Sequence, residues 1–145
     1  MTNHRIAVVV LFVFLPGLNC TDISINSGFS GPIPRGAYAY SSFDSVGAPI
    51  VNGWLTMVFS DSGSISGEWH LRSIGNPEGI GPQTGDGVLI GGTEDTLVWV
   101  ELNPQFRDHN LELRGSLNGT QYHGRWLWIS FVGVTNSGPF NAVKK

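Results

Sequence analysis

Two segments of the chain alternate between apolar and polar residues and share one pattern. Residues 65–71 (ISGEWHL) and 122–128 (YHGRWLW) align as apolar, polar, Gly, charged, Trp, variable and apolar. A side-chain period of two belongs to a β-strand, so the glycine and the tryptophan of each copy share one face. Such a glycine lets the strand bend and leaves interior room for a neighbouring indole. Asn52-Gly53-Trp54 is a degenerate third instance, with its glycine on the opposite face.

The rest of the chain predicts further short strands. Twenty glycines and eight prolines in 145 residues argue against extended helix. Asp61-Ser62-Gly63 and Asn118-Gly119 have the composition of hairpin turns, and residues 74–85 form a Gly- and Pro-rich loop expected at one rim. The expected strands are 36–43, 52–60, 64–73, 86–92, 96–103, 111–117, 121–132 and 138–144. Such a succession predicts an all-β fold, an eight-stranded antiparallel up-and-down barrel, because closure removes exposed sheet edges.

The N-terminal residues 1–20 have the order of a secretory signal, with Arg5 ahead of an apolar run over residues 6–15. The run is too short to span a membrane comfortably. Cys20, the only cysteine, follows at once, and a signal that ends in a lone cysteine resembles the bacterial lipoprotein pattern. The resemblance implies that Cys20 is lipidated. Residues 17–19 (Gly, Leu, Asn) depart from the family preference for Leu three residues before the cysteine and a small residue just before it.

Three interpretations of Cys20 stay open: lipidation, plain secretion after cleavage nearby, and a retained anchor. Each puts the domain outside the cytoplasm, and the first attaches it to a membrane through a lipid anchor only. Residues 21–35 are rich in Ser, Gly and Pro and are expected to be a tether or irregular lead-in, with the barrel domain over residues 36–145. A single cysteine allows no internal disulfide, so packing and sheet closure must hold the fold.

Charge and motifs exclude several classes of function. Only 13% of residues are charged and the net charge is -3, which leaves no basic stripe for nucleic acid. Glu68 with His70, and Asp108 with His109, pair groups that can move a proton or bind a metal, but we interpret both as solvated surface. There is no H-E-x-x-H, G-x-S-x-G or cysteine pair. We therefore expect no enzyme, no metal and no cofactor.

The predicted inward face is rich in aromatic residues. An eight-stranded barrel has an interior that side chains just fill or that holds one small ligand. Rings with a few hydroxyls and one carboxylate favour a small apolar or aromatic ligand, whereas the alternative is that the tryptophans simply pack the barrel. Burying the carboxylate of Glu101 there is energetically costly unless it is paired, hydrated or at a rim. The candidate ligand-binding residues are Trp54, Thr56, Trp69, Trp99, Glu101, Tyr122, Trp126, Trp128 and Ser130.

The opposite face carries an unusual number of aliphatic residues. On this assignment it holds Leu55, Met57, Phe59, Val98, Val100, Leu102, Leu127, Ile129 and Phe131. Such a face predicts a homodimer seam, a covering by residues 21–35, or contact with a bilayer. The reversed assignment, with aliphatics inside and tryptophans outside, stays open. Polar Glu68, His70 and Arg125 share the aliphatic face and argue against full reversal.

Part of the chain resembles a known family. The run LVWVELNPQFRDHNLELRGSLNG (97–119), with GRWLWIS (124–130), resembles the later strands of avidin-like barrels: a Trp-bearing strand, a connecting loop with Asn, Arg and His, and a second Trp-bearing strand. The ending FVGVTNSGPFNAVKK (131–145) is similar to the last hairpin of small secreted bacterial barrels. The resemblance implies a closed avidin-like or lipocalin-like (calycin-type) barrel. The final strand lacks an Asp in the expected place, so biotin binding is not implied.

The sequence thus predicts a non-enzymatic, extracytoplasmic binding module that holds a small apolar or aromatic ligand among its interior tryptophans. The alternative is an envelope lipoprotein with a filled barrel, acting as an inhibitor or assembly factor through protein-protein contact. The aliphatic outer face or the 74–85 loop would make that contact.

Overall fold

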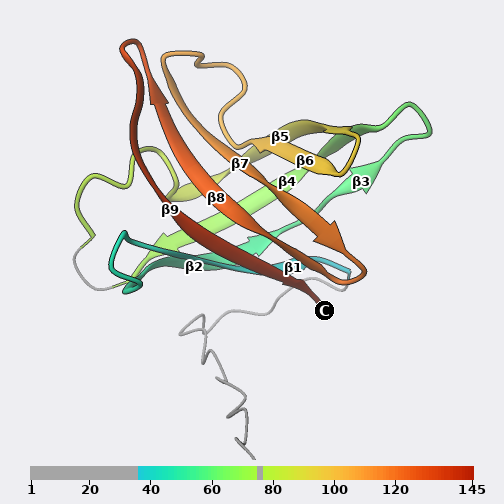
Figure 1. Cartoon of the computed structure of the whole chain (residues 1–145), viewed down its shortest axis with the longest axis horizontal. Helices are drawn as coiled ribbons and strands as arrows, with labels where there is room; N and C mark the ends of the chain where they lie inside the picture. The colour runs from blue at the N-terminus through green and yellow to red at the C-terminus, as the bar shows by residue number, and fades with distance from the viewer. Residues whose placement is uncertain (1–35, 75–76) are drawn as a thin grey trace, which may run out of the picture.

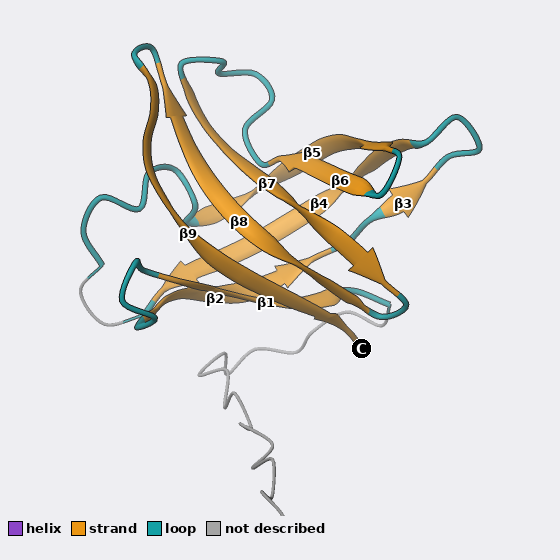
Figure 2. Ribbon diagram, in the orientation of Figure 1, coloured by secondary structure: helices purple, strands orange, loops and turns teal. Residues whose placement is uncertain are grey.

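The computed structural model describes residues 36–74 and 77–145, and all regular structure in them is β-strand (Figures 1 and 2). The strands are β1 (Tyr38–Phe43), β2 (Pro49–Leu55), β3 (Val58–Phe59), β4 (Ser64–Ser73), β5 (Gly85–Glu94), β6 (Leu97–Glu101), β7 (His109–Asn118), β8 (Gln121–Ser130) and β9 (Gly133–Lys144). Within these ranges no helix could cross a membrane. The signal expected at residues 1–20, with Cys20, and the tether expected at residues 21–35 lie outside the described residues.

The strands form one closed, antiparallel sheet. Chain neighbours pair from β4 through to β9 and β1 pairs with β2, and two further pairings, β1 with β9 and β2 with β4, complete the ring. The short β3 pairs with β4 alone and continues the line of β2 after a break at Thr56 and Met57. With β2 and β3 as one interrupted strand, the expected eight-stranded up-and-down barrel is confirmed. Figure 1 shows β7, β8 and β9 crossing β4 and β5 steeply on the far wall.

The hairpin predicted at Asn118-Gly119 forms, but one residue later than expected. Asn118 pairs with Gln121, so Gly119 and Thr120 are the two central residues of the turn. Gly119 has φ 59° and Thr120 does not have positive φ. Positive φ at the first central position alone is the mark of a type II′ turn, whereas the Asn-Gly dipeptide had favoured type I′. The last strand also begins earlier than predicted, at Gly133.

The interior of the barrel is packed with apolar side chains. The largest fully buried ones include Trp126, Tyr40 and Tyr122, and aliphatic residues from β2, β4, β5, β6 and β7 complete a single cluster. No cysteine lies in the described residues. As the composition predicted, packing and closure of the sheet hold this fold.

Glycines mark the inward face where neighbouring strands come very close. A Cβ at Gly67 would lie 1.9 Å from the carbonyl oxygen of Thr56, and one at Gly124 would lie 2.0 Å from that of Arg114. Gly53, with φ +152°, is equally tight against the carbonyl oxygen of His70. A side chain at any of these positions would overlap the backbone of the adjacent strand. The prediction that glycine provides space for tight curvature is consistent with these contacts.

Two strands present the face opposite to the one predicted. In β2, Leu55 is fully buried and pairs with inward Trp69, so Trp54 points outward. In β6, Val98 and Val100 are buried, which places Trp99 and Glu101 outside. The reversed assignment therefore holds for β2 and β6, whereas the original assignment holds for β4, β7 and β8. Leu55, Val98, Val100 and Leu102 are core residues, so the predicted face of nine apolar side chains does not exist as one surface.

The chain enters and leaves the barrel at one point. The amide of Gly36 donates to the carbonyl of Lys145 at 3.1 Å, and the amide of Lys145 donates to the carbonyl of Ala37 at 2.9 Å. These bonds extend the pairing of β1 with β9 to the last residue. The seam that closes the ring is thus hydrogen-bonded along its full length.

Candidate functional site

One end of the barrel carries the connections formed by residues 44–48, 77–84, 102–108 and 131–132. We call it the loop-bearing end. Residues 77–84, the end segment, lie across it. Asn136 of β9 donates to the carbonyl of Gly79 at 2.6 Å, and Asn103, after β6, donates to the carbonyl of Pro82 at 3.1 Å. The end segment therefore lies at one rim, as predicted, and side chains from different sides of the ring hold it.

Gln83 is the residue of the end segment whose side chain extends into the interior of the barrel. Its side chain is completely buried, although glutamine is usually exposed. Ser42 of β1 donates to Gln83 Oε1 at 3.0 Å, and Gln83 Nε2 donates to the carbonyl of Ile80 at 2.7 Å. These bonds offset the cost of burying an amide. A polar group from a loop thus occupies the mouth of an otherwise apolar barrel.

Trp128 lies beneath the same segment. A Cβ at Gly81 would come within 2.5 Å of the Trp128 ring, so only glycine allows the chain to pass so close. His109 of β7 meets the ring edge-on, with centroids 6.2 Å apart. The indole Nε1 is buried yet has no hydrogen-bond partner. A buried donor without an acceptor is costly, and it marks a place where an acceptor can bind.

Tyr40 is the other buried side chain in the described residues with an unpaired polar atom. Its ring stacks on Phe140 at 5.8 Å. Burial raises the pKa of the Tyr40 hydroxyl, and the nearby Ser42 hydroxyl opposes this in part. Tyr40, Ser42, Gln83 and Trp128 together form what we call the end cluster. It is the polar part of the interior.

The other predicted ligand-binding residues that point inward form hydrogen bonds that stabilise the fold. Trp69 Nε1 donates to the carbonyl of Leu102 at 2.6 Å, and Trp126 Nε1 donates to that of Phe43 at 2.8 Å. Tyr122 Oη lies 2.9 Å from the carbonyl of Leu113 and can donate to it. Burial is the main reason that the pKa of Tyr122 is raised. These three side chains fix strands to one another, and each has its polar atom satisfied.

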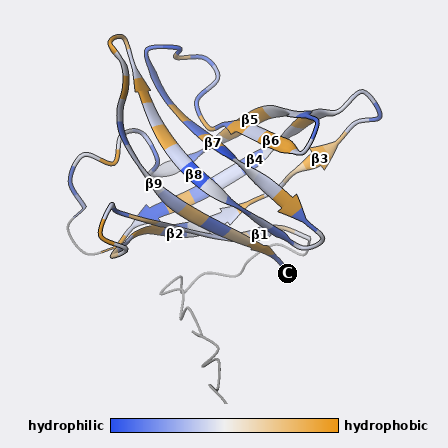
Figure 3. Cartoon of the chain, in the orientation of Figure 1, coloured by the Kyte–Doolittle hydropathy of each residue, from blue (hydrophilic) through white to orange (hydrophobic). Residues whose placement is uncertain are grey.

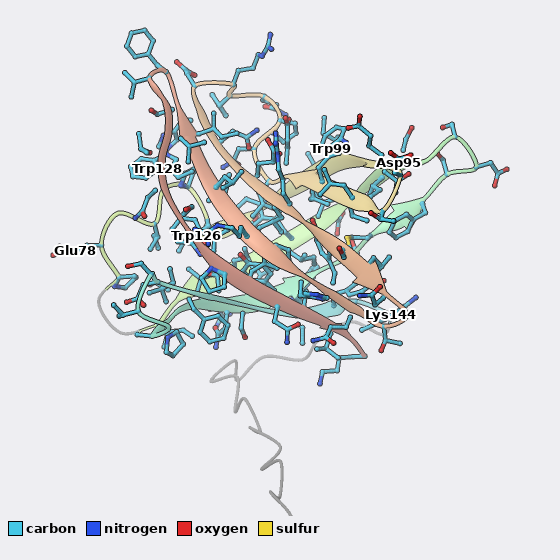
Figure 4. All side chains as sticks on the ribbon, viewed as in Figure 1. Glu78, Asp95, Trp99, Trp126, Trp128 and Lys144 are labelled. Carbon is cyan, nitrogen blue, oxygen red and sulfur yellow. The ribbon has the colours of Figure 1, made fainter. Side chains whose placement is uncertain are left out.

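Four of the predicted ligand-binding residues do not face the interior. Trp54 stacks on His70 outside the barrel, with centroids 5.9 Å apart, and Trp99 and Glu101 lie on the outer face of β6. Thr56 Oγ1 accepts from the amide of Glu68 at 2.8 Å, which ties the break between β2 and β3 to β4. Figure 4 shows Trp99 far from Trp126 and Trp128.

Ser130 is also placed differently from the prediction. Its Oγ donates to the carbonyl of Gly133 and accepts from the amide of Val132, both at 3.3 Å. The hydroxyl thus forms hydrogen bonds within the hairpin between β8 and β9. Of the nine predicted residues, the structure leaves Trp128 as the one with a buried, unpaired polar atom.

The groups considered for catalysis do not assemble into a centre. His70 Nε2 accepts from Arg72 at 3.3 Å and its ring covers Trp54, while His109 packs against Trp128. Throughout residues 36–74 and 77–145, no three His, Cys, Asp or Glu side chains are placed to share a metal ion.

Sequence reasoning missed Tyr40, Ser42 and Gln83. The first two had a signal, because AYAYSS (37–42) alternates and puts Tyr38, Tyr40 and Ser42 on one face. Gln83 had none, since nothing in GPQTG (81–85) distinguishes a buried glutamine from a solvated one.

Comparison of the chain with family models, with curated proteins and with solved structures gives no match. The fold itself is an eight-stranded antiparallel barrel, which is consistent with a calycin-like architecture.

Proposed function

We propose that the protein is a non-enzymatic binding module whose ligand site is the loop-bearing end of the barrel. The observation that supports this most directly is the unpaired Trp128 Nε1, buried beneath Gly81. The ligand carries a flat apolar part, which packs on the Trp128 ring, and a hydrogen-bond acceptor for its Nε1. To enter, it displaces Gln83 and the adjoining part of the end segment.

Because side chains fill the interior of the barrel, the proposed ligand site is smaller than the one predicted from the sequence. Trp69, Trp126 and Tyr122 already satisfy their polar atoms with backbone carbonyls, so removing them from the packing would break the barrel. The end cluster has the opposite character, because Gln83 is held by only two side-chain hydrogen bonds. A net hydrogen bond contributes about 1 kcal/mol, so a small ligand can compete with this contact. The pocket is therefore proposed at the mouth and not along the whole bore.

The test uses 8-anilinonaphthalene-1-sulfonate, which combines aromatic rings with an acceptor. We expect saturable binding, measured by dye fluorescence and by energy transfer from tryptophan. Gln83→Ala removes the competing amide and should tighten binding by roughly fivefold, the equivalent of about 1 kcal/mol. Trp128→Phe should weaken binding by a similar factor, because the Nε1 donor is lost.

The matched control is Trp99→Phe, which makes the same change on the outer face. Equal weakening in Trp99→Phe and Trp128→Phe, or no tightening in Gln83→Ala, would place the dye elsewhere and contradict the proposal. Thermal melts of each variant confirm that the barrel is intact.

We extend the proposal to the cellular location of the protein, because residues 1–20 carry a charge, an apolar run and a cysteine in the order of a secretory signal. The domain is extracytoplasmic and Cys20 carries the lipid. Kinship with avidin-like or lipocalin-like barrels belongs to the same proposal. Intact mass of the protein isolated from membranes tests the lipid, since an unmodified chain contradicts it.

A further inference from the structure

The outer face of β5 and its neighbours presents apolar side chains to solvent. Val58, Val88 and Ile90 are 65%, 53% and 44% exposed, and they lie on adjacent or nearly adjacent strands. Val58 pairs with Ser66, which in turn pairs with Ile90, so Val58 and Ile90 belong to one cross-strand row. Figure 3 shows the hydrophobic colour of β3 and β5. Exposed apolar side chains that adjoin in this way are typical of an interaction surface.

A tryptophan lies near each end of the outward-facing line of β5 that holds Val88 and Ile90: Trp54 shares a cross-strand row with Asp86, and Trp99 pairs with Gly92. Trp54 and Val88 line a hollow of about 340 Å³ with Glu68, His70 and Asp86. Trp99 lines a second hollow of about 290 Å³ with Glu94, Glu101 and Glu112. The β5 face comprises Trp54, Val58, Glu68, Asp86, Val88, Ile90, Glu94, Trp99 and Glu101.

Each of the two rings has one face covered by a neighbouring residue. A Cβ at Gly92 would lie 3.0 Å from the Trp99 ring, so one face of this indole covers the glycine while the other lines the hollow. Trp54 is stacked on the His70 ring at an interplanar angle of 21°. An indole fixed in this way offers its open face to a cation at little cost in side-chain entropy.

The charge of the β5 face is negative. Two carboxylates line the hollow beside Trp54 and three line the hollow beside Trp99, against one guanidinium, Arg114. An ion pair joins Arg114 to Glu112 and so neutralises that guanidinium. Glu68, Asp86, Glu94 and Glu101 remain to attract positive charge.

We propose that the β5 face docks an extended cationic peptide segment of a partner protein, which carries on one face a Lys or Arg near each end and apolar residues between them. The apolar side chains pack on Val88, Ile90 and Val58, and the cations enter the hollows beside Trp54 and Trp99. From Asp86 to Glu94 the strand runs roughly 26 Å at about 3.3 Å per residue, which an extended peptide of about eight residues spans.

A second copy of this chain is a poorer occupant. A twofold dimer would bring the same patch of each copy together, and would therefore oppose acidic groups to acidic groups. The proposal is also separate from the proposed ligand site, since no residue of the β5 face belongs to the end cluster. Failure of one leaves the other standing.

The experiment measures fluorescence anisotropy of a labelled peptide, Lys-Ser-Leu-Ser-Leu-Ser-Leu-Ser-Lys, whose Lys and Leu share one face when the chain is extended. We expect a Kd on the order of micromolar, weaker at high salt because the charges are exposed. The double variant Glu68→Gln with Glu101→Gln should weaken binding by about tenfold or more. The matched control, Glu78→Gln with Asp108→Asn, makes the same change in net charge at the loop-bearing end and should change binding less than about twofold.

Two comparison peptides separate charge from apolar contact. The same peptide with Gly in place of each Leu should bind at least about tenfold more weakly, and the same peptide with Glu in place of each Lys should not bind. Equal weakening in the two double variants, or equal binding of the peptides with Leu and with Gly, overturns the proposal. So does sedimentation that finds a dimer disrupted by Ile90→Lys, which would assign the face to a second copy. Circular dichroism confirms the fold of each variant.

Discussion

Trp69 and Trp126 face the interior of the barrel, whereas Trp54 and Trp99 lie on its outside. The inner pair is at most 3% exposed, and each Nε1 is bonded to the carbonyl of a residue far away in the chain. The outer pair is half-buried, with Trp54 against His70 and Trp99 against Gly92. The inner rings hold strands together, and the outer rings cover the sheet. The difference shows that tryptophan on an alternating strand does not by itself reveal the inward face.

The adjacent glycines distinguish the two pairs more reliably. Gly67 and Gly124 stand two residues before an inward tryptophan and share its face. Gly53 also points inward, against the backbone of His70, but it directly precedes Trp54 and so forces that ring outward. A glycine required by close strand contact therefore determines which residues of the strand point inward. The direction of the nearby tryptophan depends on its spacing from that glycine.

The largest expected effect comes from adding one methyl group to an inward glycine. Gly67→Ala places a Cβ 1.9 Å from the Thr56 carbonyl oxygen, and neither this backbone oxygen nor the Cα that carries the Cβ can move without its strand. We expect a loss of more than about 4 kcal/mol in the free energy of unfolding, measured with urea. Gly92→Ala, the outward control, meets only the Trp99 ring at 3.0 Å and should cost less than about 1 kcal/mol. Similar losses in the two variants would show that the close approach of strands at inward glycines does not limit closure of the barrel.

Truncation of the tryptophans themselves should give the next largest contrast. Trp126→Ala removes a fully buried ring and the bond to the Phe43 carbonyl, so we expect a loss of about 3–5 kcal/mol. Trp99→Ala removes a half-exposed ring and should cost about 1 kcal/mol or less. Chemical denaturation measures both. A cost for Trp99→Ala as large as that for Trp126→Ala would contradict the placement of Trp99 on the surface.

The smallest effect concerns alkaline pH. Burial raises the pKa of Tyr122 and Tyr40 above the ordinary value of 10.0, so their neutral forms are favoured in the barrel. In the unfolded chain they ionise near 10, and stability should therefore hold below about pH 10 and fall above it. Tyr122→Phe should flatten this fall while lowering stability at pH 7 by about 1 kcal/mol. Urea titrations from neutral to alkaline pH test this, and an unchanged slope in the variant would exclude Tyr122 as a cause.

The architecture could be predicted from the sequence because each strand carries its own local signal. Residues 64–73 were placed with both ends correct, since a turn precedes them and the alternation runs through. The faces of β2 and β6 could not be read from the tryptophans. In β6 the decisive sign was Glu101, because a carboxylate on the Trp99 face is cheaper in water than in a core. That cost was recognised, but it was given too little weight.

The candidate site could be predicted only in part, because its polar members come from separate places in the chain. Trp128 was identified from the alternation of β8, but its special feature is an absent bond, which no sequence pattern encodes. Gln83 reaches the interior because residues 77–84 are bonded to Asn103 and Asn136, two side chains brought near only when the ring closes. Long-range geometry of this kind lies beyond local propensity and periodicity.

The bonds that join Gly36 and Ala37 to Lys145 make the barrel a ring in which no strand is structurally first. A short linker between these positions would allow new ends to be opened at the exposed Gly119-Thr120 turn without loss of a pairing. Such a circular permutant would move the chain ends, and anything fused to them, to another part of the barrel surface. Cargo fused to the rearranged chain could then be directed away from either proposed binding surface.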